Sequence, residues 1–199
     1  MREPHAAVVY LFRRRPEGVG YAVLQRADDG NWQGVSGGVE TGETPADAAR
    51  RETREETGLG ATAPLYRLDM TSGVEKIWFA AAAGWPADLY IVVKHFFGMH
   101  VTAEPGEVVL SAEHRAMRWL ENDAACQALR YDDDRTALWE LHARLAAADV
   151  PAPRAPCRPV SGALHDGAPV AHRADGHRSP ATKSMITTKS MITERVGAG

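Results

Sequence analysis

The chain has 199 residues, of which 44% are hydrophobic and 25% charged, and its net charge is −3 at neutral pH. This composition is ordinary for a soluble globular protein. The sequence has neither an apolar run of about 18 residues nor an N-terminal secretory pattern, so we expect no membrane span and no export. The two cysteines, Cys126 and Cys157, form no disulfide framework, which favours a cytoplasmic location.

The composition changes beyond residue 147. Half of the 12 prolines and none of the aromatic residues lie in the last 52 residues, where a hexapeptide is repeated at 182–187 and 188–193. We therefore expect a folded domain over residues 1–147 and a proline-rich, disordered tail over 148–199. The tail has seven basic and four acidic residues, so the domain is acidic, which argues against nucleic acid as a partner.

The apolar patterns of the domain predict strands alternating with a few helices. Strands are expected at 6–12, 21–25, 32–36, 66–70, 76–81, 90–101 and 115–120, with a shorter one at 108–110. Helices are expected at 45–57, 122–129 and 132–147. Strands interleaved with helices in this way predict an α/β layered fold.

The first predicted helix has clear start and stop signals. Thr44 is a good N-cap, and Pro45 suits the first helical position. Gly58 is a good C-terminal stop. These signals bound the helix at residues 45 and 57.

Three glutamates lie on one face of this helix. At about 100° per residue, Glu52, Glu55 and Glu56 fall within an arc of roughly 100°. Carboxylates at this spacing destabilise an isolated helix by about 0.2–0.5 kcal/mol per pair, and a bound cation removes that cost. Their oxygens suit Mg²⁺ or Mn²⁺. Such a triplet alone is typical of a solvated acidic face, but the glycine loop before the helix favours a metal site beside phosphate.

The loop and helix together match the pattern G-x5-E-x7-R-E-U-x-E-E-x-G-U, in which U is apolar. The matching positions are Gly37, Glu43, Arg51, Glu52, Thr53, Glu55, Glu56, Gly58 and Leu59. This stretch resembles the Nudix box, and the one departure is Thr53, which is β-branched and close in size to valine. The resemblance covers roughly residues 4–147 and implies a Nudix-type α/β/α sandwich with a mixed β-sheet.

The resemblance also implies a reaction and a set of site residues. It implies that water attacks a phosphorus of a pyrophosphate bond in a nucleoside diphosphate linked to another group. The three helix glutamates look like ligands of Mg²⁺ or Mn²⁺, and one of them is the candidate base. Arg51 looks like the residue that orients a glutamate, and Glu43 would hold the loop against the helix. Gly37 or Gly38 would offer a carbonyl to the metal; we assign Gly37 to the metal and Gly38 to the substrate.

Further acidic candidates lie in the second half of the domain. Glu113 is a candidate metal ligand or base, with a solvated glutamate at the end of a strand as the alternative. Glu104 and Glu107 are weaker candidates for the same role. His114 is more often a packed or exposed histidine than a ligand.

Candidates for substrate contact are fewer. Trp32 is a candidate to stack on a base or pterin ring, and a core tryptophan is the alternative. Arg26 is a candidate to bind phosphate. Lys76 and Lys94 are further basic candidates, and spacing does not choose among the three.

The substrate class is predicted from local resemblance. Residues 24–26 and 32–37 resemble the Nudix subgroup that removes pyrophosphate from dihydroneopterin triphosphate or nucleoside triphosphates. The alternative is an asymmetric dinucleoside tetraphosphate hydrolase, but that group typically has Pro-Lys where Val35 and Ser36 stand here. A non-catalytic nucleotide-sensing module would have lost box glutamates, and all are present. The expected partner is thus a small phosphoanhydride, and the sequence leaves a homodimer open.

Overall fold

The computed structural model describes residues 1–59, 62–102 and 108–148. Glu104, Glu107 and Cys157 lie outside these residues, and so do the repeat at 182–187 and 188–193 and nearly all of the predicted tail. The predictions made for those segments therefore stay predictions.

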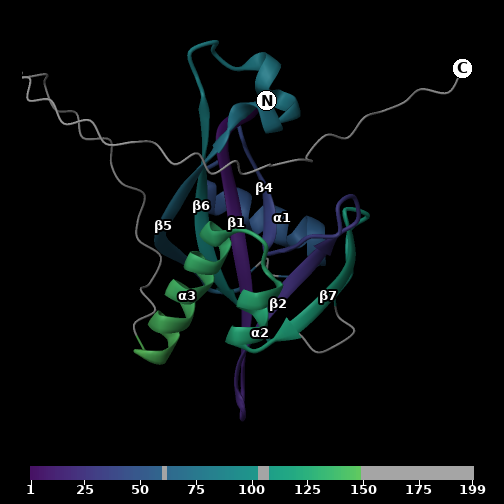
Figure 1. Cartoon of the computed structure of the whole chain (residues 1–199), viewed down its shortest axis with the longest axis vertical. Coiled ribbons are helices and arrows are strands. Elements are labelled where there is room, and N and C mark those ends of the chain that lie inside the picture. The colour runs from purple at the N-terminus through teal and green to yellow at the C-terminus, as the bar shows by residue number, and fades with distance from the viewer. Residues whose placement is uncertain (60–61, 103–107, 149–199) are drawn as a thin grey trace, which may run out of the picture. The chain divides into compact units, whose positions relative to one another are not determined.

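A seven-stranded mixed sheet forms the middle layer of the domain (Figure 1). Its strands are β1 (Arg2–Arg15), β2 (Gly18–Arg26), β3 (Trp32–Gln33), β4 (Val35–Glu40), β5 (Leu65–Glu75), β6 (Ile91–His100) and β7 (His114–Leu120). The order is β3-β2-β1-β6-β5, while β4 also pairs with β1 and β7 with β2. The central strand β1 runs antiparallel to β2 and β4 but parallel to β6.

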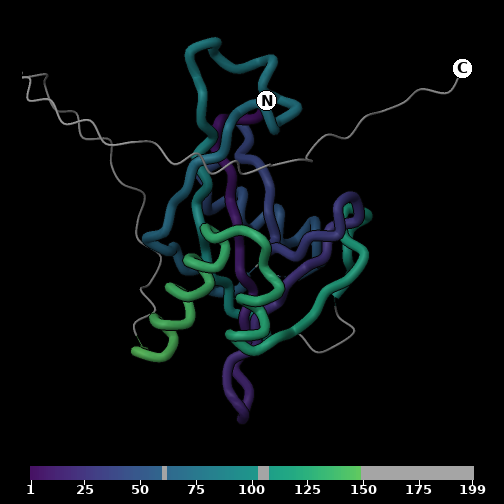
Figure 2. The backbone as a smooth tube through the Cα atoms, viewed as in Figure 1, coloured from purple at the N-terminus to yellow at the C-terminus, as the bar shows by residue number. Residues whose placement is uncertain are grey.

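Helices cover both faces of this sheet (Figures 1 and 2). Helix α1 (Pro45–Thr57) lies on one face, and α2 (Asn122–Ala128) and α3 (Asp132–Ala146) lie on the other. Side chains of β1 alternate between the two: Val9 and Leu11 join the core beneath α1, whereas Tyr10 and Phe12 join the core beneath α3. Within the described ranges no helix is long and apolar enough to cross a membrane.

Two of the predicted strands are wrong. Residues 76–81 lie mostly in two 3₁₀-helices, η1 (Lys76–Trp78) and η2 (Ala80–Gly84), at the end of the hairpin that β5 and β6 form. Their apolar side chains resemble those of a strand, but the Lys76 ammonium donates to the carbonyls of Pro86 and Ala87 and closes the segment into a loop. Residues 108–110 are irregular, and the Val109 N–H donates to the Thr57 carbonyl at the end of α1 (3.0 Å).

An ionic cluster joins α3 to the sheet. Lys94 on β6 donates to Asp133 Oδ2 at 2.7 Å, and the Ser72 hydroxyl on β5 donates to the same oxygen at 2.7 Å. The carboxylate of Asp134, which is 3% exposed, lies 3.8 Å from the same ammonium. One cation thus holds two carboxylates in the first turn of α3.

Removing this cation should destabilise the domain. Lys94→Met should lower the free energy of unfolding by about 3 kcal/mol, because a buried charge that loses its partner is costly. The double variant Lys94→Met with Asp133→Asn should recover part of that loss. Arg14→Met, an exposed charge removed from β1, is the control. Urea unfolding measures all of them, and an equal loss in the single and double variants would contradict the prediction.

Candidate active site

Helix α1, which carries the three glutamates, begins and ends where the sequence predicts. Thr44 and Asp47 form a capping box, in which the Asp47 N–H donates to the Thr44 hydroxyl and the Thr44 N–H donates to the Asp47 carboxylate. Gly58 ends the helix with φ 72°, a left-handed conformation that favours glycine. The unusual Thr53 is fully buried, and its hydroxyl donates to the Ala49 carbonyl at 2.8 Å, so its polar group is satisfied.

The structure separates the three glutamates by burial. Glu52 is 7% exposed and Glu56 only 3%, whereas the side chain of Glu55 is 53% exposed. Residues four apart lie on one helix face, so the two buried carboxylates are neighbours beneath α1. Buried carboxylates are rare unless paired or bound to a cation. Their burial therefore argues against a merely solvated acidic face.

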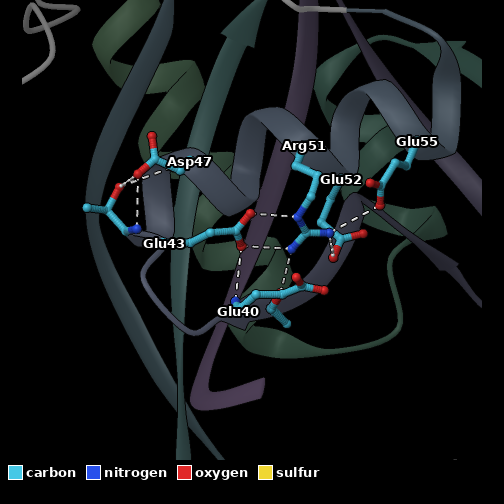
Figure 3. Close-up of polar contacts among 8 residues, drawn as sticks. Glu40, Glu43, Asp47, Arg51, Glu52 and Glu55 are labelled. Carbon is cyan, nitrogen blue, oxygen red and sulfur yellow. Dashed lines mark hydrogen bonds and ion pairs between the residues drawn. The ribbon is translucent and has the colours of Figure 1, made fainter. Parts of the chain in front are cut away.

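Arg51 organises the site (Figure 3). Its Nε and Nη2 donate to the two carboxylate oxygens of Glu43. Its Nη1 donates to Glu52 at 2.7 Å and to Glu55 at 3.1 Å. Its Nη2 also donates to the Gly38 carbonyl at 2.9 Å. A guanidinium has five N–H donors, so all of them are used. The hydrogen bonds from Arg51 are also the main reason that the pKa of Glu43 is lowered.

Gly37 lies against the buried carboxylate of Glu52. A Cβ atom placed on Gly37 would come within 1.9 Å of Glu52 Cδ, so the glutamate side chain occupies the space that a larger residue would need. A glycine is therefore required at position 37, because the Glu52 side chain lies too close to leave room for a Cβ atom.

Gly37→Ala should therefore reduce activity more than stability. The added methyl group must displace the Glu52 side chain, which is flexible enough to move, so we expect kcat to fall about 100-fold, as when a group supporting a site is lost. The melting temperature should change by only a few degrees. Gly84→Ala is the control, because a Cβ there would meet no atom of the described residues within 4 Å. Equal activity in the two variants would contradict this account.

Glu56 has an incompletely satisfied carboxylate. Its Oε1 accepts from the Ser36 N–H at 3.3 Å, but its buried Oε2 has no hydrogen-bond partner among the described residues. Burial, reinforced by the charge of Glu52, raises the pKa of Glu56 to about 8. An oxygen left bare in this way is suited to a ligand that donates or carries positive charge.

His114 lies beside Glu56, although the sequence pattern favoured a packed or exposed histidine over a ligand. It is 6% exposed, its Nδ1 is 3.7 Å from Glu56 Oε2, and neither ring nitrogen has a hydrogen-bond partner in the described part of the chain. Burial lowers the pKa of His114, so at neutral pH the imidazole is uncharged and the contact is not an ion pair. The only sequence signal for it was the Glu-His pair before the last strand.

The donor set suits a hard divalent cation. No group of three or more His, Cys, Asp or Glu side chains is arranged to hold a metal in residues 1–59, 62–102 and 108–148. Arg51 donates hydrogen bonds to oxygens of Glu52 and Glu55. Carboxylate oxygens are the ligands that Mg²⁺ and Mn²⁺ prefer, and the buried Glu56 Oε2 has no hydrogen-bond partner among the described residues. The residues therefore fit such a cation.

Glu113 lies at the edge of this site. It is exposed in the turn before β7, and its backbone carbonyl accepts from the Ala27 N–H at 2.8 Å. Its charge contributes to the raised pKa of Glu56, although less than burial and Glu52 do. Its carboxylate therefore lies close enough to influence Glu56.

The predicted substrate contacts are already engaged within the protein. Arg26 donates both Nε and Nη2 to Asp28. Trp32 is half-buried, and the Arg118 guanidinium lies 4.9 Å from the centre of its ring. Gly38 accepts from Arg51, as described above. Any substrate would have to compete with these partners.

Comparison with known proteins identifies the family. The family model of the NUDIX domain matches residues 1–141. The chain belongs to the Nudix hydrolase family. The asymmetrical bis(5'-nucleosyl)-tetraphosphatase of Sus scrofa is 33% identical over 144 residues, which cover 69% of this chain and 92% of that protein. The dihydroneopterin triphosphate diphosphatase of Escherichia coli K12 is 29% identical over 149 residues, which cover 69% and 91%.

Two further comparisons concern length and fold. A Myxococcus xanthus protein named octanoyltransferase is 38% identical over 130 residues, which cover 65% of this Nudix chain but only 30% of that longer protein. A structure described as a NUDIX hydrolase from Listeria monocytogenes has a TM-score of 0.68 at 32% identity, covering 75% of this chain and 99% of that one. The predicted family, α/β/α fold and hydrolase class are therefore confirmed.

Proposed function

We propose that the protein is a metal-dependent pyrophosphohydrolase that cleaves a nucleoside or pterin triphosphate into a monophosphate and pyrophosphate. The observation that carries this proposal is the pair of buried carboxylates, Glu52 and Glu56, beside the glycines of β4. Glu52 is held by Arg51, and Glu56 has one oxygen without a partner. A site that buries acidic groups in this way is suited to gathering cations around an anionic substrate.

The side chains would divide the work as follows. Glu52 and Glu56, with Glu55 at the exposed side, would hold Mg²⁺ or Mn²⁺. Such an ion, when bound, neutralises phosphate oxygens and lowers the pKa of a coordinated water. Arg51 is a positioning residue, because it fixes Glu52 while its own donors are all engaged. The carbonyl of Gly37 and the carboxylate of Glu113 are further proposed metal contacts.

The choice of substrate rests on resemblance. The residues before the box favour the triphosphate subgroup, and the E. coli relative is named for dihydroneopterin triphosphate. Asymmetric cleavage of a dinucleoside tetraphosphate is the second candidate, because the relative named for that activity is slightly more similar, at 33% against 29% identity. Arg26, Trp32 and Gly38 are proposed substrate contacts for either class.

A hydrolysis screen tests the proposal. The full chain would be incubated with Mg²⁺ and each of the common nucleoside triphosphates, dihydroneopterin triphosphate and diadenosine tetraphosphate. Pyrophosphate released from a triphosphate would support the leading substrate class, whereas turnover of the tetraphosphate alone would favour the second. No turnover of any phosphoanhydride with Mg²⁺ or Mn²⁺ would overturn the function, and an EDTA-treated sample provides the blank.

Three statements about the whole protein stay predictions. A domain boundary near residue 147 is supported by the family match over 1–141 and by the end of α3 at Ala146. A cytoplasmic location and a homodimer rest on the sequence alone. Light scattering of the purified chain would measure its mass in solution directly.

A further inference from the structure

Arg2 is held at the edge of the active site by residues that lie far away in the sequence. It is the first residue of β1 and pairs with Glu40 at the end of β4. The Trp85 indole N–H donates to the Arg2 carbonyl at 2.6 Å, and the Thr41 N–H donates to the Met1 carbonyl at 2.8 Å. The backbone at Arg2 is therefore fixed from two sides.

The side chain of Arg2 lies over Gly38 of β4. A Cβ atom placed on Gly38 would come within 2.6 Å of Arg2 Nη1, so the guanidinium covers the face of this glycine. Side chains alternate along a strand, so Arg2 covers the face of β4 opposite to that on which Glu52 fills the space at Gly37. The charge of Arg2 also acts on two carboxylates of the site: it opposes the rise that burial causes in the pKa of Glu52, and it adds slightly to the lowering of the pKa of Glu43 by Arg51.

Arg2 differs from the other basic residues considered for this site in having free donors. All five donors of Arg51 are used, Arg26 is paired with aspartate, Lys94 is paired with aspartate, and Lys76 donates to two carbonyls. Arg2 is exposed, and its guanidinium makes neither a hydrogen bond nor an ion pair within the described part of the chain. A guanidinium with free donors is suited to bind an anion.

We propose that the Arg2 guanidinium binds a phosphate group of the phosphoanhydride substrate, from the side of Gly38 opposite to the carboxylates. The identity of this ligand rests on the proposed function. A planar guanidinium matches two phosphate oxygens at once, which supplies both attraction and orientation. Trp85 is a positioning residue in this scheme, because its indole fixes the backbone from which Arg2 extends. The segment with η1 and η2 thereby takes part in substrate binding without touching the substrate.

Kinetics of Arg2 variants test the proposal. Arg2→Met should raise KM for the substrate about 10- to 100-fold, the loss expected for a hydrogen-bonded charge, while kcat changes by less than about threefold. Arg2→Lys should recover part of the affinity, and Trp85→Phe should raise KM by an intermediate factor. Arg14→Met removes a charge from the other end of the same strand and should leave KM unchanged. The melting temperature of Arg2→Met should equal that of the wild type.

Binding of inorganic tripolyphosphate, measured by calorimetry at fixed free Mg²⁺, separates this proposal from the proposed function. Weaker binding to Arg2→Met than to Arg14→Met supports the role of Arg2, even if the wild type hydrolyses nothing in the screen. A wild type that is active, with KM and tripolyphosphate affinity unchanged in Arg2→Met, overturns the role of Arg2 and leaves the proposed function standing. An equal loss of tripolyphosphate affinity in both variants would also overturn the role of Arg2, because the effect would then be common to any positive charge on the surface.

Discussion

Replacing Glu56 with glutamine should lower kcat about 1,000-fold while leaving the Nudix domain folded. Glutamine keeps the size of the side chain and its contact with the Ser36 N–H, but it removes the charge that the proposed metal site needs. A loss of several kcal/mol in stabilising the transition state corresponds to a reduction of this size. Steady-state kinetics at saturating Mg²⁺, with far-ultraviolet circular dichroism as a check on folding, measure the effect.

A matched substitution away from the site provides the control. Glu17 is an exposed glutamate in the turn between β1 and β2, so Glu17→Gln should leave kcat unchanged. If Glu56→Gln retained activity within about threefold of Glu17→Gln, a catalytic role for the buried carboxylate pair would be refuted.

The same substitution should change how stability depends on pH. When a chelator removes divalent metal ions, burial holds the pKa of Glu56 at about 8, against 4.5 for an unburied glutamate. Between these values the folded domain retains a proton that the unfolded chain has lost, so the free energy of unfolding falls as pH rises through this range. Glu56→Gln lacks this titration, so it should gain stability relative to the wild type between about pH 5 and pH 9. Urea unfolding at the two pH values tests this. If the free energies of unfolding of the variant and the wild type differed by the same amount at both pH values, the prediction would be contradicted.

Arg51→Lys should reduce both activity and stability, although it conserves charge. Lysine has three donors on a point charge and cannot reproduce the five-donor fork that joins Glu43, Glu52 and the Gly38 carbonyl. We expect kcat to fall about 100-fold, as for other residues that orient a metal ligand. The free energy of unfolding should fall by about 2 kcal/mol, because acceptors in the site lose their partners.

Arg54→Lys is the matched control for this substitution. Arg54 lies on the same helix but is exposed in its last turn, so its replacement should change neither kcat nor stability measurably. Thermal unfolding and kinetics on the pair of variants decide the matter. A similar loss in both would mean that α1 needs arginine for helix stability rather than for the site.

The features that could be predicted from the sequence are those that depend on local signals. The capping pair Thr44 and Asp47 and the left-handed Gly58 act within a few residues, so the bounds of α1 were predictable to the residue. The same helical geometry placed Glu52 and Glu56 on one face. The prediction for residues 76–81 was wrong for the opposite reason: the apolar residues fit a strand pattern, but no strand in the described part of the chain pairs with them.

Features of the site that depend on tertiary contacts could not be read from the sequence. That Glu56 is buried while Glu55 is exposed depends on which side of α1 packs against β4 and β1, and this is a tertiary contact. His114 lies beside Glu56, which is 58 positions away in the sequence, and Arg2 lies beside Gly38, which is 36 positions away. Spacing along the chain has no bearing on such contacts.

The pairing of β1 has a consequence for the order in which the chain can fold. β1 is synthesised before the other strands of this sheet, and its parallel partner β6 begins nearly 90 residues later, with His5 opposite Val93. Until β6 is made, the edge of β1 that later pairs with it has no partner along residues 5–12, and such edges invite aggregation. Pairings of this sequence separation also slow folding. The nascent domain should therefore depend on chaperones until about residue 100 has emerged from the ribosome.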